Sequence, residues 1–138
     1  MTTTLDMEDI RNLNLFQRIT LIKTRFCFSY NNTTFFCVPK SMLMKAIGRE
    51  GRNVKTMNQI LKRRIRIIPS PDGISDIKRF IESIVNPVTF KDIGVSENEV
   101  ILNAGSQSKA ALIGRDKRRL IEMQGIIKDF FGKDFRIV

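Results

Sequence analysis

The stretch IGREGRNV, residues 47–54, has two glycines three positions apart, and the chain on either side of it has the apolar spacing of helices. The same pattern returns as IGRDKRRL at residues 113–120, 66 positions further along the chain. The two copies also agree in order and residue type upstream and downstream of these stretches. We therefore interpret the chain as two copies of one unit, residues 1–69 and residues 70–138.

The first unit begins with a predicted helix, for which Asp6 is a candidate N-cap. Apolar residues recur along this helix at helical spacing: Ile10, Leu13, Phe16 and Ile19. Two segments rich in β-forming residues, 25–30 and 33–38, then flank Asn31-Asn32. Asparagines tolerate positive φ, so this arrangement predicts a β-hairpin with a two-residue turn.

A short helix over residues 41–47 follows the hairpin and ends at Gly48. The helix after the second glycine has apolar residues that we expect on one face: Val54, Met57, Ile60 and Leu61. A strand over residues 64–68 then closes the unit. Four methionines in the chain are interpreted as core residues: Met42, Met44, Met57 and Met123.

The second unit repeats this order. Its first helix carries isoleucines at helical spacing and ends before Pro87: Ile74, Ile77, Ile81 and Ile84. The later elements are predicted as strands near residues 88–94 and 99–104, helices over 106–113 and 118–131, and a closing strand over 134–138. Each unit therefore has the predicted order α-β-β-α-α-β.

The charge of the chain favours a polyanionic partner. Its 138 residues include 24 Lys and Arg against 14 Asp and Glu, a formal net charge of +10. A balance of this kind is most often associated with binding to nucleic acid. Residues 1–69 hold 13 basic and 4 acidic residues, whereas residues 70–138 hold 11 and 10. The excess charge lies almost entirely in the first unit.

Several classes of function are excluded by composition. The chain has no histidine and only two cysteines, so catalytic triads and a structural zinc site are not expected. No nucleotide-binding loop or paired carboxylates suited to acid–base catalysis are found. We expect no enzyme activity, no cofactor and no metal. No apolar run approaches the ~20 residues that cross a bilayer, so we expect a cytoplasmic protein without a membrane partner.

The glycine pair suggests how an anion is bound. Glycine lets the backbone approach a ligand closely, and the start of the following helix attracts negative charge. Basic residues surround both loops. The candidate RNA-binding residues of the first unit are Lys45, Gly48, Arg49, Gly51, Arg52 and Lys55, and those of the second are Gly114, Arg115, Lys117, Arg118 and Arg119.

A leading helix, a hairpin, a helix–G-x-x-G–helix and a final strand resemble the KH domain, in its type II (prokaryotic) arrangement. The resemblance implies an α+β fold of two tandem type II KH domains, each with a mixed three-stranded sheet covered by helices. In that family the G-x-x-G loop holds the backbone of about four unpaired nucleotides, while the bases lie in an adjacent apolar groove. The partner implied is single-stranded RNA.

Two KH units with a five-residue connector, PSPDG at 69–73, are similar to the archaeal NusA-like transcription factors. The stretches LFQRIT, VPKSMLMKAIGREGRNVKTM and IKRFIESIVNPV carry this likeness, which covers nearly the whole chain. It implies an RNA-binding role in transcription elongation and termination, with RNA polymerase or other transcription machinery as further partners.

The two loops depart from the family pattern in different ways. Glu50 places a carboxylate close to where the phosphate is expected, and this should weaken binding unless the side chain points away or pairs with Arg49 or Arg52. The second loop ends in Lys117 in place of glycine, and a residue with a Cβ resists positive φ. The first unit, 1–69, is therefore predicted to be the stronger RNA binder.

Other roles remain open from sequence. The same fold serves ribosome assembly and RNA decay, and degenerate KH units act as protein-interaction scaffolds, a reading that the second loop favours for residues 70–138. The state of the cysteines is also open. If Asn31-Asn32 forms the turn, Cys27 lies opposite Phe36, whereas a loop one residue longer places Cys27 opposite Cys37. Free thiols are the usual state in the cytosol.

Overall fold

The computed structural model describes residues 6–138, which divide into two compact units, 6–70 and 71–138. Each unit has the order α-β-β-α-α-β and one three-stranded sheet. Short 3₁₀ turns precede some of the helices or connect one helix to the next. This confirms the α+β class and the arrangement expected for two tandem type II KH domains. In the part of the chain that is described, no helix is long and apolar enough to cross a membrane.

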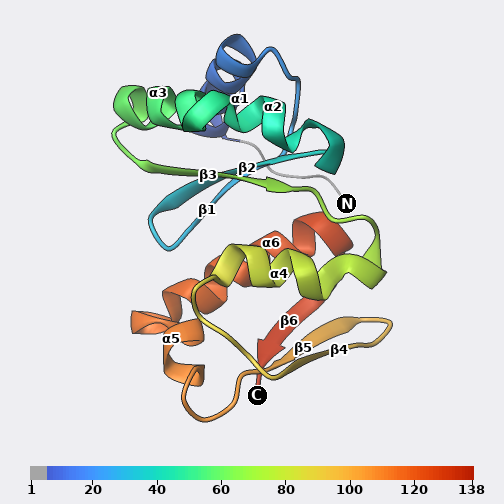
Figure 1. Ribbon diagram of the computed structural model, residues 1–138. Coiled ribbons are helices and arrows are strands. Elements are labelled where there is room, and N and C mark those ends of the chain that lie inside the picture. The colour runs from blue at the N-terminus through green and yellow to red at the C-terminus, as the bar shows by residue number, and fades with distance from the viewer. Residues whose placement is uncertain (1–5) are drawn as a thin grey trace. The chain divides into compact units, whose positions relative to one another are not determined.

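The first unit consists of α1 (Met7–Thr20), β1 (Cys27–Tyr30), β2 (Thr33–Val38), α2 (Leu43–Ile47), α3 (Arg52–Leu61) and β3 (Arg64–Pro69). Strand β2 lies in the centre of the sheet, antiparallel to β1 and parallel to β3. The parallel pairing requires a crossover, which α2 and α3 supply. Figure 1 shows the three helices on one face of this sheet.

Local chemistry fixes the start of α1 and the hairpin. The Asp6 carboxylate accepts a hydrogen bond from the Asp9 backbone N–H at 2.8 Å, while the Asp9 carboxylate accepts from the Asp6 N–H. This capping box satisfies two donors that the helix cannot pair internally. Asn31 and Asn32 have φ angles of 51° and 59°, so the predicted two-residue turn is confirmed.

That turn also settles the cysteines. The hairpin pairs Cys27 with Phe36, so Cys27 and Cys37 point to opposite faces of the sheet and both are free thiols. Burial raises the pKa of the Cys27 thiol to about 12. A thiol in that state is chemically inert at neutral pH.

The core of the first unit forms between α1 and the sheet. The rings of Phe16 and Phe36 are fully buried and stack with their centroids 4.6 Å apart. Val38 from the same strand as Phe36, Ile67 from β3 and Met57 from α3 complete this cluster. Every second residue of β2 therefore points toward the helices, whose inward residues recur every three or four positions.

The second unit consists of α4 (Ile77–Val85), β4 (Asp92–Val95), β5 (Glu99–Asn103), α5 (Lys109–Ile113), α6 (Arg118–Phe131) and β6 (Asp134–Ile137). Its strand pairing is the same, with β5 central, antiparallel to β4 and parallel to β6. Helices α4 and α6 lie side by side (Figure 1), and the rings of Phe80 and Phe130 are 4.8 Å apart.

Some sequence-based predictions of boundaries and burial are wrong. Strand β4 covers only Asp92–Val95 rather than 88–94, and α5 begins at Lys109 rather than 106. Two methionines assigned to the core, Met42 and Met44 (82%), are instead exposed, as are Ile10 and Ile60 (56%), which belong to the apolar patterns of their helices. Helices α1 and α3 bury a narrower face than their apolar pattern suggests, and α2 is a helix of only five residues.

We expect Phe16→Ala to lower the free energy of unfolding by about 3–5 kcal/mol, because it leaves a cavity in the core beside Phe36. The control is Met7→Ala in the same helix, at a residue that is 72% exposed. That change should stay within about 0.5 kcal/mol. Urea unfolding followed by circular dichroism measures both, and equal losses would contradict the assignment of Phe16 to the core.

Candidate nucleic-acid interface

The first glycine of the loop has a backbone conformation that excludes other residues. Gly48 has φ 82° and ψ 165°, a region that residues with a Cβ essentially never occupy. A Cβ placed there would lie 3.0 Å from the Asn53 side chain and 3.1 Å from the Asn53 backbone nitrogen. The chain therefore turns tightly at Gly48, and α3 begins close beside the end of α2.

The second glycine is required less strictly. Gly51 has φ 74° and ψ 20°, in the left-handed region, and the nearest atom to an added Cβ is 4.0 Å away. Between the two glycines, Glu50 also has a positive φ of 55°. A hydrogen bond from the Gly51 N–H to the Gly48 carbonyl oxygen, 3.1 Å long, closes the turn.

The second loop has nearly the same backbone as the first. Gly114 has φ 78° and ψ 170°, and Asp116 has φ 57° where Glu50 has 55°. Lys117 occupies the left-handed conformation with φ 60°, so the expected resistance of a lysine to positive φ does not change the shape of the loop. A left-handed lysine costs roughly 1–2 kcal/mol, which the surrounding turn outweighs.

Side chains from the following helices hold both turns. The Asn53 amide donates to the Ala46 carbonyl oxygen at 3.0 Å, at the end of α2. At the corresponding place in the second unit, the Arg119 guanidinium donates to the Ala111 carbonyl oxygen at 2.9 Å. Arg119, a candidate RNA-binding residue, is therefore partly buried and engaged in holding the end of α5.

The basic side chains predicted for the first unit come together around the loop. Lys45, Arg49, Arg52 and Lys55 are all exposed. A shallow hollow of about 580 Å³ lies here, lined by Arg49, Glu50, Arg52, Lys55, Thr56 and Gln59. Thr56 and Gln59 were missed from sequence, although their spacing from Arg52 and Lys55 places them on the same helix face.

Glu50 is exposed at the rim of this hollow and, within residues 6–138, makes no ion pair with Arg49 or Arg52. Three cationic side chains therefore surround one carboxylate. In the second unit, Arg115, Lys117 and Arg118 are exposed around Asp116. Each loop thus combines a glycine-shaped backbone with an excess of positive charge.

The starts of the helices after the loops differ from the start of α1. The N-cap residues of α3 and α6, Gly51 and Lys117, make no side-chain capping hydrogen bond. At α1 the Asp6 carboxylate fills that role. The Arg52 and Arg118 N–H groups, the first of α3 and α6, instead donate to the Arg49 and Arg115 carbonyl oxygens within the turns. What each helix start offers an anion is its dipole, which favours negative charge there.

Comparison with known proteins gives a consistent set of relatives. No protein-family model matches the sequence. Three archaeal proteins described as "Probable transcription termination protein NusA" are similar to it. That of Methanococcus vannielii is 28% identical over 126 residues, covering 88% of this chain and 70% of the relative. That of Halococcus morrhuae is 25% identical, covering 94% of this chain and 97% of the relative. That of Methanocaldococcus jannaschii is 29% identical, covering 66% of this chain and 48% of the relative.

One solved structure shows the same fold. The crystal structure of APE1850 is similar with a TM-score of 0.68 and 24% sequence identity, covering 97% of this chain and 99% of that one. The fold is therefore shared over nearly all of the part of this chain that the structure describes.

We expect Gly48→Ala to destabilise the first unit by about 3 kcal/mol, because its backbone lies in a glycine-only region and the new Cβ meets Asn53. Gly51→Ala should cost only about 1 kcal/mol, since the left-handed region is accessible and the space is open. Chemical unfolding of the full chain measures both. Equal costs at the two positions would contradict the different roles assigned to the two glycines.

Proposed function

We propose that this chain, which is similar to archaeal NusA proteins over most of its length, is a non-catalytic single-stranded RNA-binding protein of transcription elongation and termination. In this proposal the loop from Gly48 to Gly51 holds the RNA backbone. One observation carries this proposal. The start of α3 has no side-chain cap and lies beside a glycine turn, among exposed cationic side chains.

The contacts expected with RNA follow from this arrangement. A phosphate beside Gly51 is attracted by the dipole at the start of α3, and Arg49, Arg52 and Lys55 neutralise its charge. Unpaired nucleotides fit such a loop better than a duplex, because their bases can turn away from the backbone into apolar surroundings. The exposed Met44, one turn before Gly48, offers apolar surface of that kind.

The first unit is the stronger binder in this proposal. The two loops have nearly the same backbone angles, so the difference rests on charge. Residues 1–69 carry a net charge of +9, whereas residues 70–138 carry +1. In addition, Arg119 is occupied with the Ala111 carbonyl, which leaves fewer free cations at the second loop. The names of the archaeal relatives support a place in transcription termination, where nascent RNA and the transcription machinery are the partners.

We expect the full chain to prefer single-stranded RNA over a duplex of the same sequence. With about 3–5 phosphates neutralised, the logarithm of the binding constant should fall against the logarithm of salt concentration with a slope of about −2 to −3.5. Fluorescence anisotropy at several salt concentrations measures this. Equal affinity for the two forms, or no dependence on salt, would refute the proposal.

The paired change Arg49→Asp with Glu50→Asp should weaken RNA binding about a hundredfold, because it removes a guanidinium and places two carboxylates where the phosphate lies. Both glycines remain, and aspartate tolerates the positive φ at position 50, so the fold is retained.

The matched variant in the second unit is Arg115→Asp, which creates the same pair of carboxylates because Asp116 is already present. We expect a loss of about threefold to tenfold for this variant. Both are measured on one RNA at one salt concentration. A larger loss for Arg115→Asp would reverse the ranking of the two units.

A further inference from the structure

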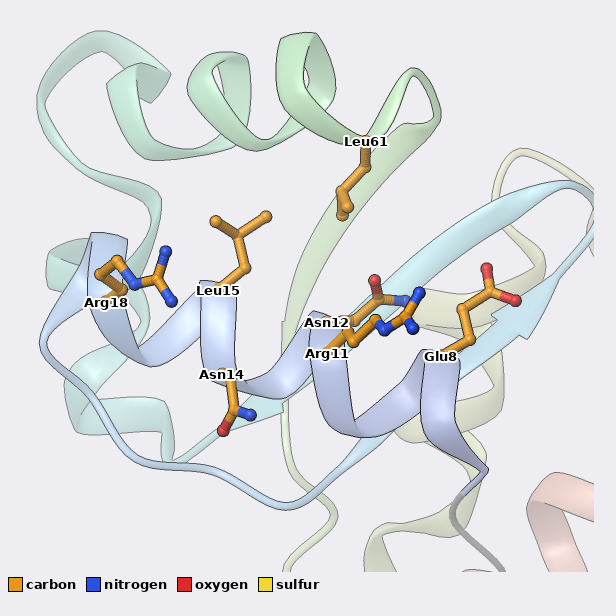
Figure 2. A pocket seen from close by; sticks show the side chains of 7 residues that line it. All are labelled: Glu8, Arg11, Asn12, Asn14, Leu15, Arg18 and Leu61. Atoms are coloured by element: carbon orange, nitrogen blue, oxygen red, sulfur yellow. The ribbon is translucent and has the colours of Figure 1, made fainter.

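A second hollow in the first unit lies between α1 and the far end of α3, with a volume of about 590 Å³. Figure 2 shows Leu61 pointing from the end of α3 toward α1, and Leu15 and Arg18 pointing from α1 toward α3. It shares no lining residue with the hollow at the loop. Helix α3 has ten residues, so its two ends are about 15 Å apart.

The lining combines an apolar floor with positive charge. Glu8, Arg11, Leu15 and Arg18 are spaced by three or four residues along α1, which places them on one face of the helix. The side chains of Leu15 and Leu61 form the apolar part, whereas the Asn14 side chain points from α1 away from them (Figure 2). The volume falls within the roughly 300–1,000 Å³ that is typical of ligand sites.

The guanidinium groups of this hollow are not neutralised by the protein. The Glu8 carboxylate pairs with Arg63, with Oε1 and Nη1 3.5 Å apart, and not with Arg11 one turn further along α1. Within the described residues, Arg11 and Arg18 form no ion pair. Both are exposed, so an anion entering the hollow meets two free cations.

Helix α3 has a positively charged face that begins at the loop. Arg52, Lys55, Gln59 and Lys62 are spaced by three or four residues, so they share one face of α3 and its C-terminal cap, and all four are exposed. No acidic residue occurs between Arg52 and Lys62. At about 100° per residue, Leu61 lies on the opposite side of α3 from this face, so the hollow beside α1 is a cationic surface of the first unit that is separate from the loop.

We propose that the hollow between α1 and α3 is a second contact for the same RNA strand and holds a nucleotide beyond those at the loop. The proposal rests on the proposed function. Arg11 and Arg18 contact phosphate, and the two leucines provide an apolar surface for a base. A polyanionic strand is favoured because, among residues 6–138, the two guanidinium groups of the hollow have no ion-pair partner, and because residues 1–69 carry a net charge of +9.

The test compares two lengths of RNA on the full chain carrying Arg11→Gln and Arg18→Gln together. One RNA has about four nucleotides, the length that a single loop holds. The other has about twelve, within the range of extended single-strand sites. The variant should bind the longer RNA about tenfold more weakly, with a salt slope shallower by about 1.4, and bind the shorter RNA within about twofold of the unchanged protein.

The matched control is Arg25→Gln, which removes an exposed guanidinium from the same unit without lining either hollow. It should leave the difference between the two RNAs unchanged. Unaltered binding of the longer RNA by the double variant overturns this inference while leaving the loop proposal standing. Failure of the unchanged protein to bind either RNA overturns both. Binding of a labelled leucine–glutamate peptide that the double variant abolishes, with RNA binding unaffected, assigns the hollow to a protein segment instead.

Discussion

The backbone at the first glycine of each loop is the constraint on which the candidate site depends. With φ near 80° and ψ near 165–170°, Gly48 and Gly114 reverse the chain so tightly that a Cβ would meet the residue five positions later. Because of this turn, the helix before the loop ends close to the place where the helix after the loop begins. The helix that follows begins at an exposed residue, where its dipole attracts an anion.

The backbone geometry of the two loops and the charge around them vary independently in this chain. The first and third positions of the two loops differ by at most 5° in φ and ψ, and the last by 14° in φ, although one loop ends in glycine and the other in lysine. The left-handed region costs a residue with a Cβ far less than the conformation of Gly48 would, so the second glycine is replaceable and the first is not. What distinguishes the units is the number of free cations around each loop.

Much of the fold follows from local signals in the sequence. Asp6 and Asn31-Asn32 specify a helix start and a hairpin register through hydrogen bonds within a few residues, and both are found as predicted. Met44 was predicted in the core and Ile60 on an apolar helix face, yet both are exposed, because an apolar pattern in a helix does not show which positions another element covers. The capping role of Arg119 was also missed, since it depends on a carbonyl group that only the folded turn brings near.

The position of α1 gives the first unit a feature that a loop and two helices alone would lack. Its capping box uses Asp6 and Asp9 at the N-terminal end, and Arg63 pairs with Glu8, so the carboxylates of α1 are engaged near its start. Arg18 is left free in the last turn. The acidic side chains of α1 therefore lie near its N-terminus and are engaged within the unit, whereas the basic Arg18 near its C-terminus has no ion-pair partner among the described residues. A strand of RNA that extends past the loop is attracted along α3, and it meets no unpaired carboxylate on that helix. A longer binding path therefore needs this arrangement of charge and no change in the fold.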